Sequence, residues 1–501
     1  MSAALPPAST AAGQARSQRA GWWPLVIIAT AHLMAVVDTT VMFVALPSVQ
    51  RSLHMSVASR QWVVTAYTLA LAGLLLLGGR LADRLGARRT LLIGVIGFAL
   101  ASATGGAAVN GVMLIVARAV QGAFGAVLIS STKSLLVTVY TDDRERARVM
   151  GIFTATLTAG ISLGLILGGV LTSELSWRWC LYINVALALV PVFGASRFLP
   201  SVAARPQVRI DLISAVLATA GMAALVYGLG DASTYGWGDA RIVSSLAAAA
   251  VLLGGFVARQ VGHPSRLLPL RIVTDRVRGW SMITLVVNGL STFGMLLILT
   301  YQLQVVMHYS ALRTGLALVP FAAAAGLGSA LLAPRLMLRV PARWLITGSL
   351  VVEAAGLVPL IWLTTRSHYL PLIFLATLVE GLGTGVAGPA TLNLALSRVL
   401  PADRGAAGAG TSAASQLGSS IGGALLNTVA ASATAAYLAV HAAAGVTTAT
   451  VHGYAVAMAW GAIITFAVAT PVAVFISARA GRSPATPGRL VSGSESKTST
   501  P

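Results

Sequence analysis

The feature that most constrains the fold is a series of long apolar segments separated by short polar stretches. About 20 apolar residues suffice for a helix to cross the hydrocarbon core of a bilayer. Of the 501 residues, 56% are hydrophobic and 10% are charged, which excludes a soluble globular protein. The sequence therefore predicts an all-α membrane protein with fourteen transmembrane helices. Their approximate extents are 22–46, 61–79, 89–109, 111–138, 147–172, 179–199, 210–230, 242–262, 279–305, 314–334, 342–365, 369–397, 405–435 and 453–478.

The distribution of Lys and Arg tests this number of helices, because cytoplasmic loops of membrane proteins are enriched in both. With a cytoplasmic N-terminus, the inside segments hold 26 of the 34 basic residues and the outside loops hold six. A missed or extra helix would disturb this alternation, so we expect both termini on the cytoplasmic side of the plasma membrane. The net charge of +20 forms no continuous patch, which argues against a nucleic-acid partner. The lipid bilayer is the partner that the composition indicates.

Two six-helix blocks of similar layout suggest a 6+2+6 arrangement, typical of transporters built from two bundles. We predict a bundle at 22–200, a linker with two extra transmembrane helices at 201–278 and a second bundle at 279–478. The polar ends, 1–21 and 479–501, read as disordered cytoplasmic tails. A single cysteine excludes an internal disulfide.

Asp38 lies within the first apolar segment, where a carboxylate costs about 2.5–3.5 kcal/mol on insertion scales. Such a residue serves as a proton relay, binds a cation or pairs with a buried base. Arg118, in the fourth segment, is its natural partner, since both lie about 10–12 Å below the outer surface at a rise of 1.5 Å per residue. Arginine keeps its charge, so it can hold Asp38 ionised until a proton competes. A static structural ion pair is the alternative.

A glycine- and arginine-rich string follows the second segment and reads as a loop in which Asp83 caps a helix or pairs with an arginine. The string resembles the signature loop of the major facilitator superfamily. Other stretches resemble its fourteen-helix drug:proton antiporter branch (EmrB/QacA-like), and the likeness covers most of residues 30–430. These stretches are Asp38–Pro47, Trp62 with Tyr67, Arg118–Gly122, Trp177–Trp179 with Ile183-Asn184, and Tyr301–Gln304 through Tyr309-Ser310 to Gly315.

The resemblance implies a major facilitator fold and roles for particular residues. It associates Arg118 with proton coupling, and it makes the string a cytoplasmic gate between the bundles. The gate residues are Gly79, Asp83, Arg84, Gly86 and Arg88. A glycine motif for close helix packing matches Gly160, Gly164, Gly168 and Gly169. Two positions depart from the pattern: Leu165 replaces the motif proline and Phe43 replaces an asparagine, which suggests a more hydrophobic pocket.

In this superfamily the first and fourth helices of each bundle line the central cavity. On that basis Glu380 is expected to be a second proton or cation site, whereas Glu353, on a usually peripheral helix, is expected to be neutral or partnered. Lys133 either reaches the headgroups, forms a local pair or binds an anionic substrate group. We expect the substrate cavity to include Phe43, Tyr67, Gln121, Phe124, Asn288, Phe293, Tyr301, Gln304 and Glu380.

The sequence contains no nucleotide-binding loop, metal-ligand cluster or hydrolase arrangement, so it predicts neither an enzyme nor a cofactor. We expect a proton gradient to supply the energy. The predicted function is proton-coupled efflux of hydrophobic, cationic or amphipathic small molecules, with no obligatory protein partner. Two alternatives stay open: export of an anionic or neutral natural product such as a self-made antibiotic, and a membrane sensor without turnover.

Overall fold

The computed structural model describes residues 22–140, 142–200, 211–262, 270–397, 399, 404–441, 443 and 445–476, and the tails predicted at the two ends lie outside these ranges. The long helices of the first half are α2 (Trp22–Ser52), α3 (Val57–Leu85), α4 (Ala87–Gly106), α5 (Gly111–Val139), α6 (Asp143–Val170), α7 (Trp179–Phe198), α8 (Leu212–Tyr235) and α9 (Ala240–Gly262). Those of the second half are α11 (Arg276–Tyr301), α12 (Ala311–Leu327), α14 (Ala342–Leu357), α15 (Phe374–Leu396), α16 (Arg404–Val440) and α17 (Val446–Phe475). Short helices are α10 (Leu270–Val273) and α13 (Ala333–Arg339).

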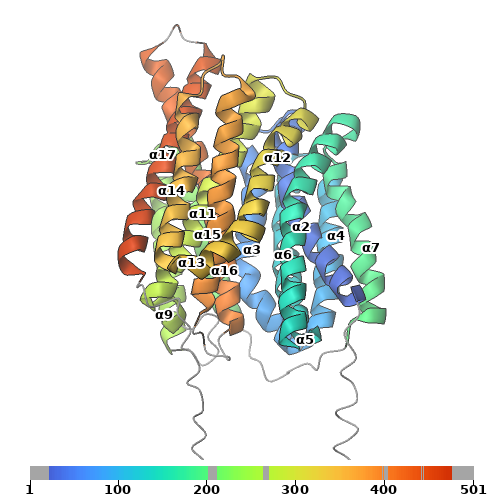
Figure 1. Ribbon diagram of the computed structural model, residues 1–501. Coiled ribbons are helices and arrows are strands. Elements are labelled where there is room, and N and C mark those ends of the chain that lie inside the picture. The colour runs from blue at the N-terminus through green and yellow to red at the C-terminus, as the bar shows by residue number, and fades with distance from the viewer. Residues whose placement is uncertain are drawn as a thin grey trace, which may run out of the picture.

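These helices confirm the predicted fold. Thirteen helices in the described part of the chain are long and apolar enough to cross a membrane, and α6 is the fourteenth. The first helix begins and the last helix ends on the same side of the molecule (Figure 1), as an even number of crossings requires. Large apolar side chains such as Leu100, Phe193 and Val251 are more than 60% exposed, which is the surface that lipid covers.

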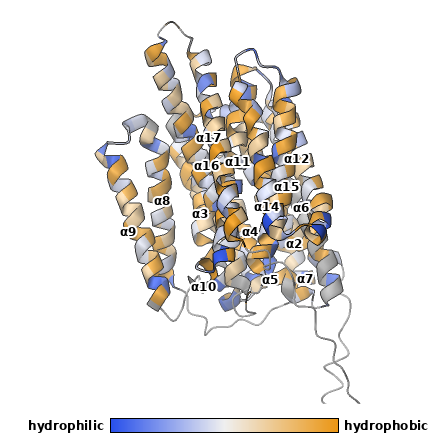
Figure 2. Ribbon diagram, turned by 60° about the vertical axis from the view of Figure 1, so that its left-hand side comes forward, coloured by the Kyte–Doolittle hydropathy of each residue, from blue (hydrophilic) through white to orange (hydrophobic). Residues whose placement is uncertain are grey.

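Helices α2 to α7 pack together as one bundle, and α11 to α17 pack as the other. Helices α8 and α9 pack against each other at one edge of the molecule (Figure 2), and α8 contacts both α3 and α16. Asp211 anchors this pair at the cytoplasmic end, since it accepts hydrogen bonds from the N–H of Ser214 and from Arg259. Burial raises the pKa of Asp211, but the bonds from Ser214 and Arg259 outweigh it, so the pKa lies below its usual value.

The bundles meet through α6 with α12 and through α3 with α16. The contact of α6 with α12 is very close near its outer end. A Cβ on Gly315 would lie 2.2 Å from the carbonyl oxygen of Leu165, and a Cβ on Gly169 would lie 2.7 Å from the Cα of Leu312. Leu165, at the position of the motif proline, is thus fully buried in the contact between the two bundles.

Several predicted boundaries were wrong: α17, for example, begins at Val446 and not near 453. Two of the differences affect the predicted motifs. Helix α2 continues through Pro47 to Ser52 instead of ending near Leu46, because proline interrupts only one backbone hydrogen bond and its neighbours stay buried. The string at 78–89 is mostly helical, not a loop: α3 runs to Leu85 and α4 begins at Ala87. Only Gly86, with φ of 88°, breaks the helix, since glycine adopts this conformation without steric cost.

The glycines of α6 allow it to lie directly on α2, and this contact yields a prediction. A Cβ on Gly168 would lie 2.9 Å from the carbonyl oxygen of Val41, so Gly168→Ala must push the two helices apart. Overpacking of this kind costs about 1–3 kcal/mol, and we expect a lower midpoint of thermal unfolding in detergent. Gly348→Ala is the matched control, because a Cβ on Gly348 would meet no atom within 4 Å. Equal midpoints for the two variants would contradict this interpretation.

Candidate functional site

Asp38 lies at the centre of a buried polar network inside the first bundle. Its Oδ2 pairs with the Nη1 of Arg118 at 2.6 Å. Its Oδ1 accepts hydrogen bonds from Gln121 at 2.7 Å and from Asn184 at 2.8 Å. The amide of Gln121 also donates to the hydroxyl of Ser102 at 2.6 Å. All five side chains are at most 1% exposed, so helices α2, α4, α5 and α7 all contribute to one enclosed network.

Arg118 is held on its other sides as well. Its Nε donates to the carbonyl oxygen of Val63 on α3 at 3.0 Å, and its Nη1 donates to the Oε1 of Gln121 at 2.6 Å. The guanidinium lies 4.3 Å from the centre of the Tyr67 ring, an interaction that favours a cation. Within the described residues its Nη2 has no hydrogen-bond partner. The ion pair is therefore fixed in place but leaves one donor unsatisfied.

In this geometry the stability of the buried network depends on the charge of Asp38. A buried ion pair is stable only while both charges are present, because either charge alone would be buried without compensation. Protonation of Asp38 would neutralise the acceptor of three hydrogen bonds at once. The helices that contribute these donors would then lose their common acceptor.

A second buried network lies in the other bundle and contains two carboxylates. The Oε2 of Glu353 on α14 accepts a hydrogen bond from Asn288 at 3.1 Å. The Oε1 of Glu380 on α15 accepts from Thr292 at 2.9 Å and from Thr384 at 3.2 Å. Asn288 and Thr384 are 3.4 Å apart, so they join the two carboxylates into one network. Both glutamates are fully buried, and neither has a Lys or Arg within 4 Å among the described residues.

Several polar atoms of this second network are unsatisfied. The Oε1 of Glu353, the Oε2 of Glu380 and the hydroxyl of Ser291 have no hydrogen-bond partner among the described residues. Two buried carboxylates without a cationic partner are costly in their ionised forms. The network is therefore suited to hold a proton. Glu353, expected to be neutral or partnered, accepts its hydrogen bond from Asn288 and belongs to the same network as Glu380.

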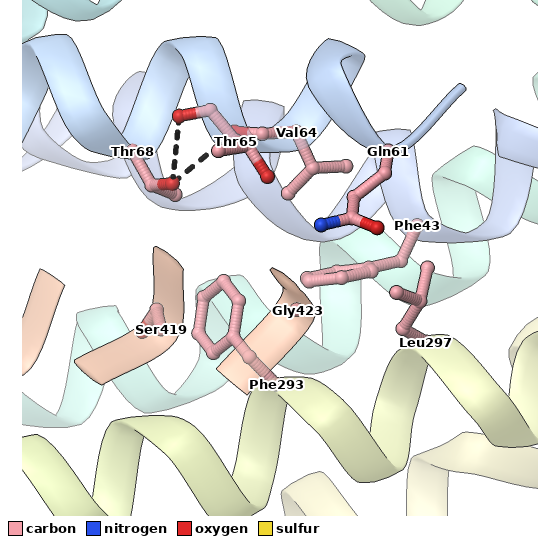
Figure 3. A pocket seen from close by; sticks show the side chains of 9 residues that line it. All are labelled: Phe43, Gln61, Val64, Thr65, Thr68, Phe293, Leu297, Ser419 and Gly423. Atoms are coloured by element: carbon pink, nitrogen blue, oxygen red, sulfur yellow. Dashed lines mark hydrogen bonds between the residues drawn. The ribbon is translucent and has the colours of Figure 1, made fainter. Parts of the chain in front are cut away.

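The centre of the molecule, between the bundles, holds a cavity of only about 10 Å³ (Figure 3). Phe43 on α2 and Phe293 on α11 line it, with ring centres 5.0 Å apart at an angle of 72°. Further outward, the amide of Gln304 donates to the carbonyl oxygen of Val44 at 2.8 Å. The volume suffices for about one water molecule. Phe43 and Phe293 therefore bring the two bundles into contact around this small cavity.

The other predicted cavity residues fall in different places. Tyr67 and Gln121 belong to the Asp38 network, and Asn288 and Glu380 to the second one. Tyr301 lies under Arg60, 3.7 Å from the guanidinium to the ring centre. Phe124 packs against Gly97 of α4, within the first bundle, because the rotation of an almost wholly apolar helix cannot be read from its sequence.

The predicted gate residues lie at the cytoplasmic end of α3 and the start of α4. Arg88 donates to the carbonyl oxygens of Ser196 and Leu199 at the end of α7, at 3.2 and 3.4 Å, and so binds within its own bundle. Asp83 and Arg84 are exposed. Asp83 does not cap α4, whose N-terminal cap is Gly86.

Lys133 is exposed on the cytoplasmic half of α5 and reaches across to the other bundle. Its Nζ donates to the hydroxyl of Ser412 on α16 at 2.5 Å. Of the three roles considered for Lys133, the structure shows a pairing, and this pairing is a hydrogen bond to a neutral hydroxyl and not an ion pair.

In the Asp38 network, sequence reasoning left out Asn184 and Ser102; in the second network it left out Ser291, Thr292 and Thr384. Asn184 belongs to the Ile183-Asn184 pair at the start of α7, one of the stretches that resemble the antiporter branch, so the sequence did contain a signal for this residue. Ser102 is one of many small residues of α4 and carries no signal of its own.

Comparison with known proteins places this architecture in a family. Residues 28–423 match the Major Facilitator Superfamily. Puromycin resistance protein pur8 of Streptomyces alboniger is 43% identical over 480 residues, 94% of each chain. Cephamycin export protein CmcT of Amycolatopsis lactamdurans is 40% identical over 415 residues, 82% of this chain and 85% of that protein. Tetracenomycin C resistance and export protein of Streptomyces glaucescens is 31% identical over 428 residues, 85% of this chain and 79% of that one.

Among solved structures, a bacterial homologue of the human lysosomal transporter Spinster, in an inward-facing and unoccupied conformation, superposes with a TM-score of 0.65. It is 16% identical and covers 94% of this chain and 100% of its own, so this likeness bears on the fold alone. The sequence relatives reach further, since they are resistance and export proteins that share nearly the whole chain. The chain belongs to the Major Facilitator Superfamily and is one of its multi-pass plasma-membrane efflux transporters.

Proposed function

We propose that this transporter exports hydrophobic small molecules in exchange for protons, and that Asp38 is the principal proton site. The observation that carries the proposal is the enclosed ion pair of Asp38 with Arg118, in which one carboxylate accepts hydrogen bonds from three side chains. A proton on Asp38 weakens this pair and changes the contacts of four helices together. Proton binding from outside then favours opening toward the cytoplasm, where substrate binding and proton release occur together.

The second network supplies a further proton site in this scheme. Glu353 and Glu380 are buried without a cation, so one or both carry a proton in the conformation described here. Opening of the second bundle to water would remove the cost of their ionised forms and release that proton. Glu353 is thereby added to Glu380 as a candidate for proton coupling.

The substrate path is proposed to run between the bundles past Phe43 and Phe293. These rings are in contact, so they must separate before a drug-sized molecule can pass. The cytoplasmic string around Asp83, Arg84 and Arg88 is proposed to close the opposite end when the outer end opens. Its arginines are then available to the second bundle, whereas Arg88 here binds the end of α7.

Everted membrane vesicles test the proposal directly. Respiration acidifies the vesicle interior, and a fluorescent dye reports the pH gradient. We expect a transported compound to dissipate part of this gradient only in vesicles that contain the protein. The first compounds to test are puromycin, cephamycin and tetracenomycin C, because they appear in the names of three relatives.

Two outcomes would contradict proton coupling. One is uptake of a compound into the vesicles that continues at the same rate after nigericin has collapsed the pH gradient. The other is uptake of a compound without any change in the dye signal. Absence of transport for every compound across a broad cationic, neutral and anionic panel would favour the sensor alternative.

A further inference from the structure

A cavity of about 850 Å³, partly open to the outside, lies outward of the centre. The outer end of α2, the start of α3, the outer ends of α8 and α11, and parts of α16 and α17 line it. Its volume falls within the range of about 300–1,000 Å³ typical of small-molecule sites. On α2 the cavity begins at Pro47, just beyond Phe43 and Val44, which contact the second bundle at the centre. It therefore lies on the outward continuation of the proposed path.

The cavity carries positive charge and no negative charge. Arg51, Arg60 and His54 line it, and no Asp or Glu does. Neither arginine has a carboxylate within 4 Å among the described residues. Asp231, the nearest acid along α8 to the lining residue Gly230, is buried and is not part of the lining. The field inside this cavity therefore favours an anion.

Arg60 is already fixed in an orientation suited to bind one. Its Nη1 donates to the Oε1 of Gln50 at 2.8 Å, and its guanidinium lies over the ring of Tyr301 at 3.7 Å. Its guanidinium also hydrogen-bonds to Tyr454, which lines the same cavity. These contacts hold the plane of the group and leave the remaining donors for a ligand. A planar fork of donors matches the two oxygens of a carboxylate or sulfonate. The side chain is half-buried, which strengthens its interaction with an anion relative to open water.

Part of the wall is suited to an apolar body. Ala430, Ala431 and Leu438 of α16 line the cavity together with the arginines, and polar residues such as Thr434 and Tyr454 complete it. We propose that this cavity is an exit site that binds the anionic group of an amphipathic organic anion through Arg60 and Arg51, so that the exported molecules include such anions. The inference rests on the proposed export function and assigns its substrate class.

Glu380, expected in the substrate cavity, would have helped to favour a cationic cargo. Glu380 is instead enclosed with Glu353, and Asp38 is enclosed by its own donors. No carboxylate lines either the central cavity or the outer one. The residues that a cargo would meet in the two cavities therefore favour the anionic alternative.

Binding of matched probes to the full-length protein tests the site. The probes are 1-pyrenesulfonate and 1-pyrenemethylammonium, which share an apolar body and differ in the sign of their charge. Fluorescence anisotropy is measured in phosphatidylcholine nanodiscs, with empty nanodiscs subtracted. We expect the sulfonate to bind at least about tenfold more tightly than the ammonium, which corresponds to about 1.4 kcal/mol. Arg60→Gln should weaken sulfonate binding by about tenfold and leave ammonium binding unchanged.

Arg313→Gln is the matched control, because Arg313 also lies over a tyrosine ring, at 3.8 Å, on the outer side but does not line the cavity. It should leave both affinities unchanged. Arg51→Gln provides an independent test if Arg60→Gln fails to fold, since Arg51 is exposed and its one hydrogen bond to a described residue is to Ser48. Equal affinity for the two probes, or sulfonate binding that neither substitution weakens, would overturn the inference.

Two further measurements distinguish this exit site from a lipid-binding site and from a failure of the proposed function. Displacement of the sulfonate by phosphatidylglycerol in the nanodiscs would assign the site to lipid headgroups and overturn the exit-site role. Asp38→Asn should retain sulfonate binding, because Asp38 lies in a separate enclosed network. Intact, Arg60-dependent binding in wild-type protein that shows no proton-coupled transport would refute the proposed function and leave the anion site standing.

Discussion

Asp38→Asn is expected to abolish export driven by a pH gradient while the protein still folds and inserts. Asparagine has nearly the same shape as aspartate, and its oxygen can still accept a hydrogen bond from Arg118. It cannot take up or release a proton. In everted vesicles, substrate-dependent dissipation of the pH gradient should fall to the level of vesicles without the protein. Passive exchange of labelled substrate down its own gradient should continue, because neutral asparagine resembles the protonated carboxyl and so permits the conformational change without a proton.

Glu174→Gln is the matched control for this substitution, because it also removes one carboxylate but at an exposed position on the outer side. We expect full gradient-driven export from it. Size-exclusion chromatography should show the same monodisperse protein for both variants. Full efflux driven by the pH gradient in Asp38→Asn would rule out Asp38 as the principal proton site.

The fold could be predicted from the sequence because the bilayer imposes strong and local rules. A transmembrane helix needs a run of apolar residues, and basic residues gather on the cytoplasmic side. The number of helices and their direction therefore follow from the order of apolar and basic residues along the sequence. Helix ends follow less strictly. Helix α2 extends past Pro47 to Ser52, and α3 continues through the gate string to Leu85, since contacts with other helices stabilise these turns.

The charged part of the site could also be predicted, because a charge inside the membrane needs a partner. This argument brings Asp38 and Arg118 together, and their contact at 2.6 Å agrees with it. Neutral polar residues give no comparable signal, which is why Ser102 was not predicted. The union of Glu353 with Glu380 depends on close packing of α14 on α15. A Cβ on Gly383 would lie 2.5 Å from the backbone nitrogen of Glu353, a contact that no sequence pattern indicates.

Arg60 shows a different limit. It stands in an outside loop by the topology, where a basic residue is ordinary and solvated. Only the fold places it against Tyr301 of the second bundle and at the wall of a cavity. The sequence thus predicts which charges lie within the membrane and need a partner. Only the fold shows which charges of the outside loops come together at one cavity.

Removal of Arg118 is expected to destabilise the protein more than removal of Asp38, and removal of both is expected to restore much of the loss. Arg118→Met leaves a carboxylate fully buried, with only the neutral donors of Gln121 and Asn184. Loss of one partner of a buried ion pair typically costs about 3–5 kcal/mol. The double variant Asp38→Asn with Arg118→Met contains no buried charge at this position, and a buried pair is often replaced by neutral residues at little cost.

The midpoint of thermal unfolding in detergent, measured for the wild type, both single variants and the double variant, gives the coupling between the two side chains. We expect the double variant to unfold at a higher temperature than Arg118→Met alone, although it carries one substitution more. Additive losses would mean that the two groups do not stabilise each other, and Asp38 would then gain or lose its proton without consequence for Arg118. A strong coupling instead means that the proton on Asp38 and the contacts of Arg118 change together, which an exchange of protons for substrate requires.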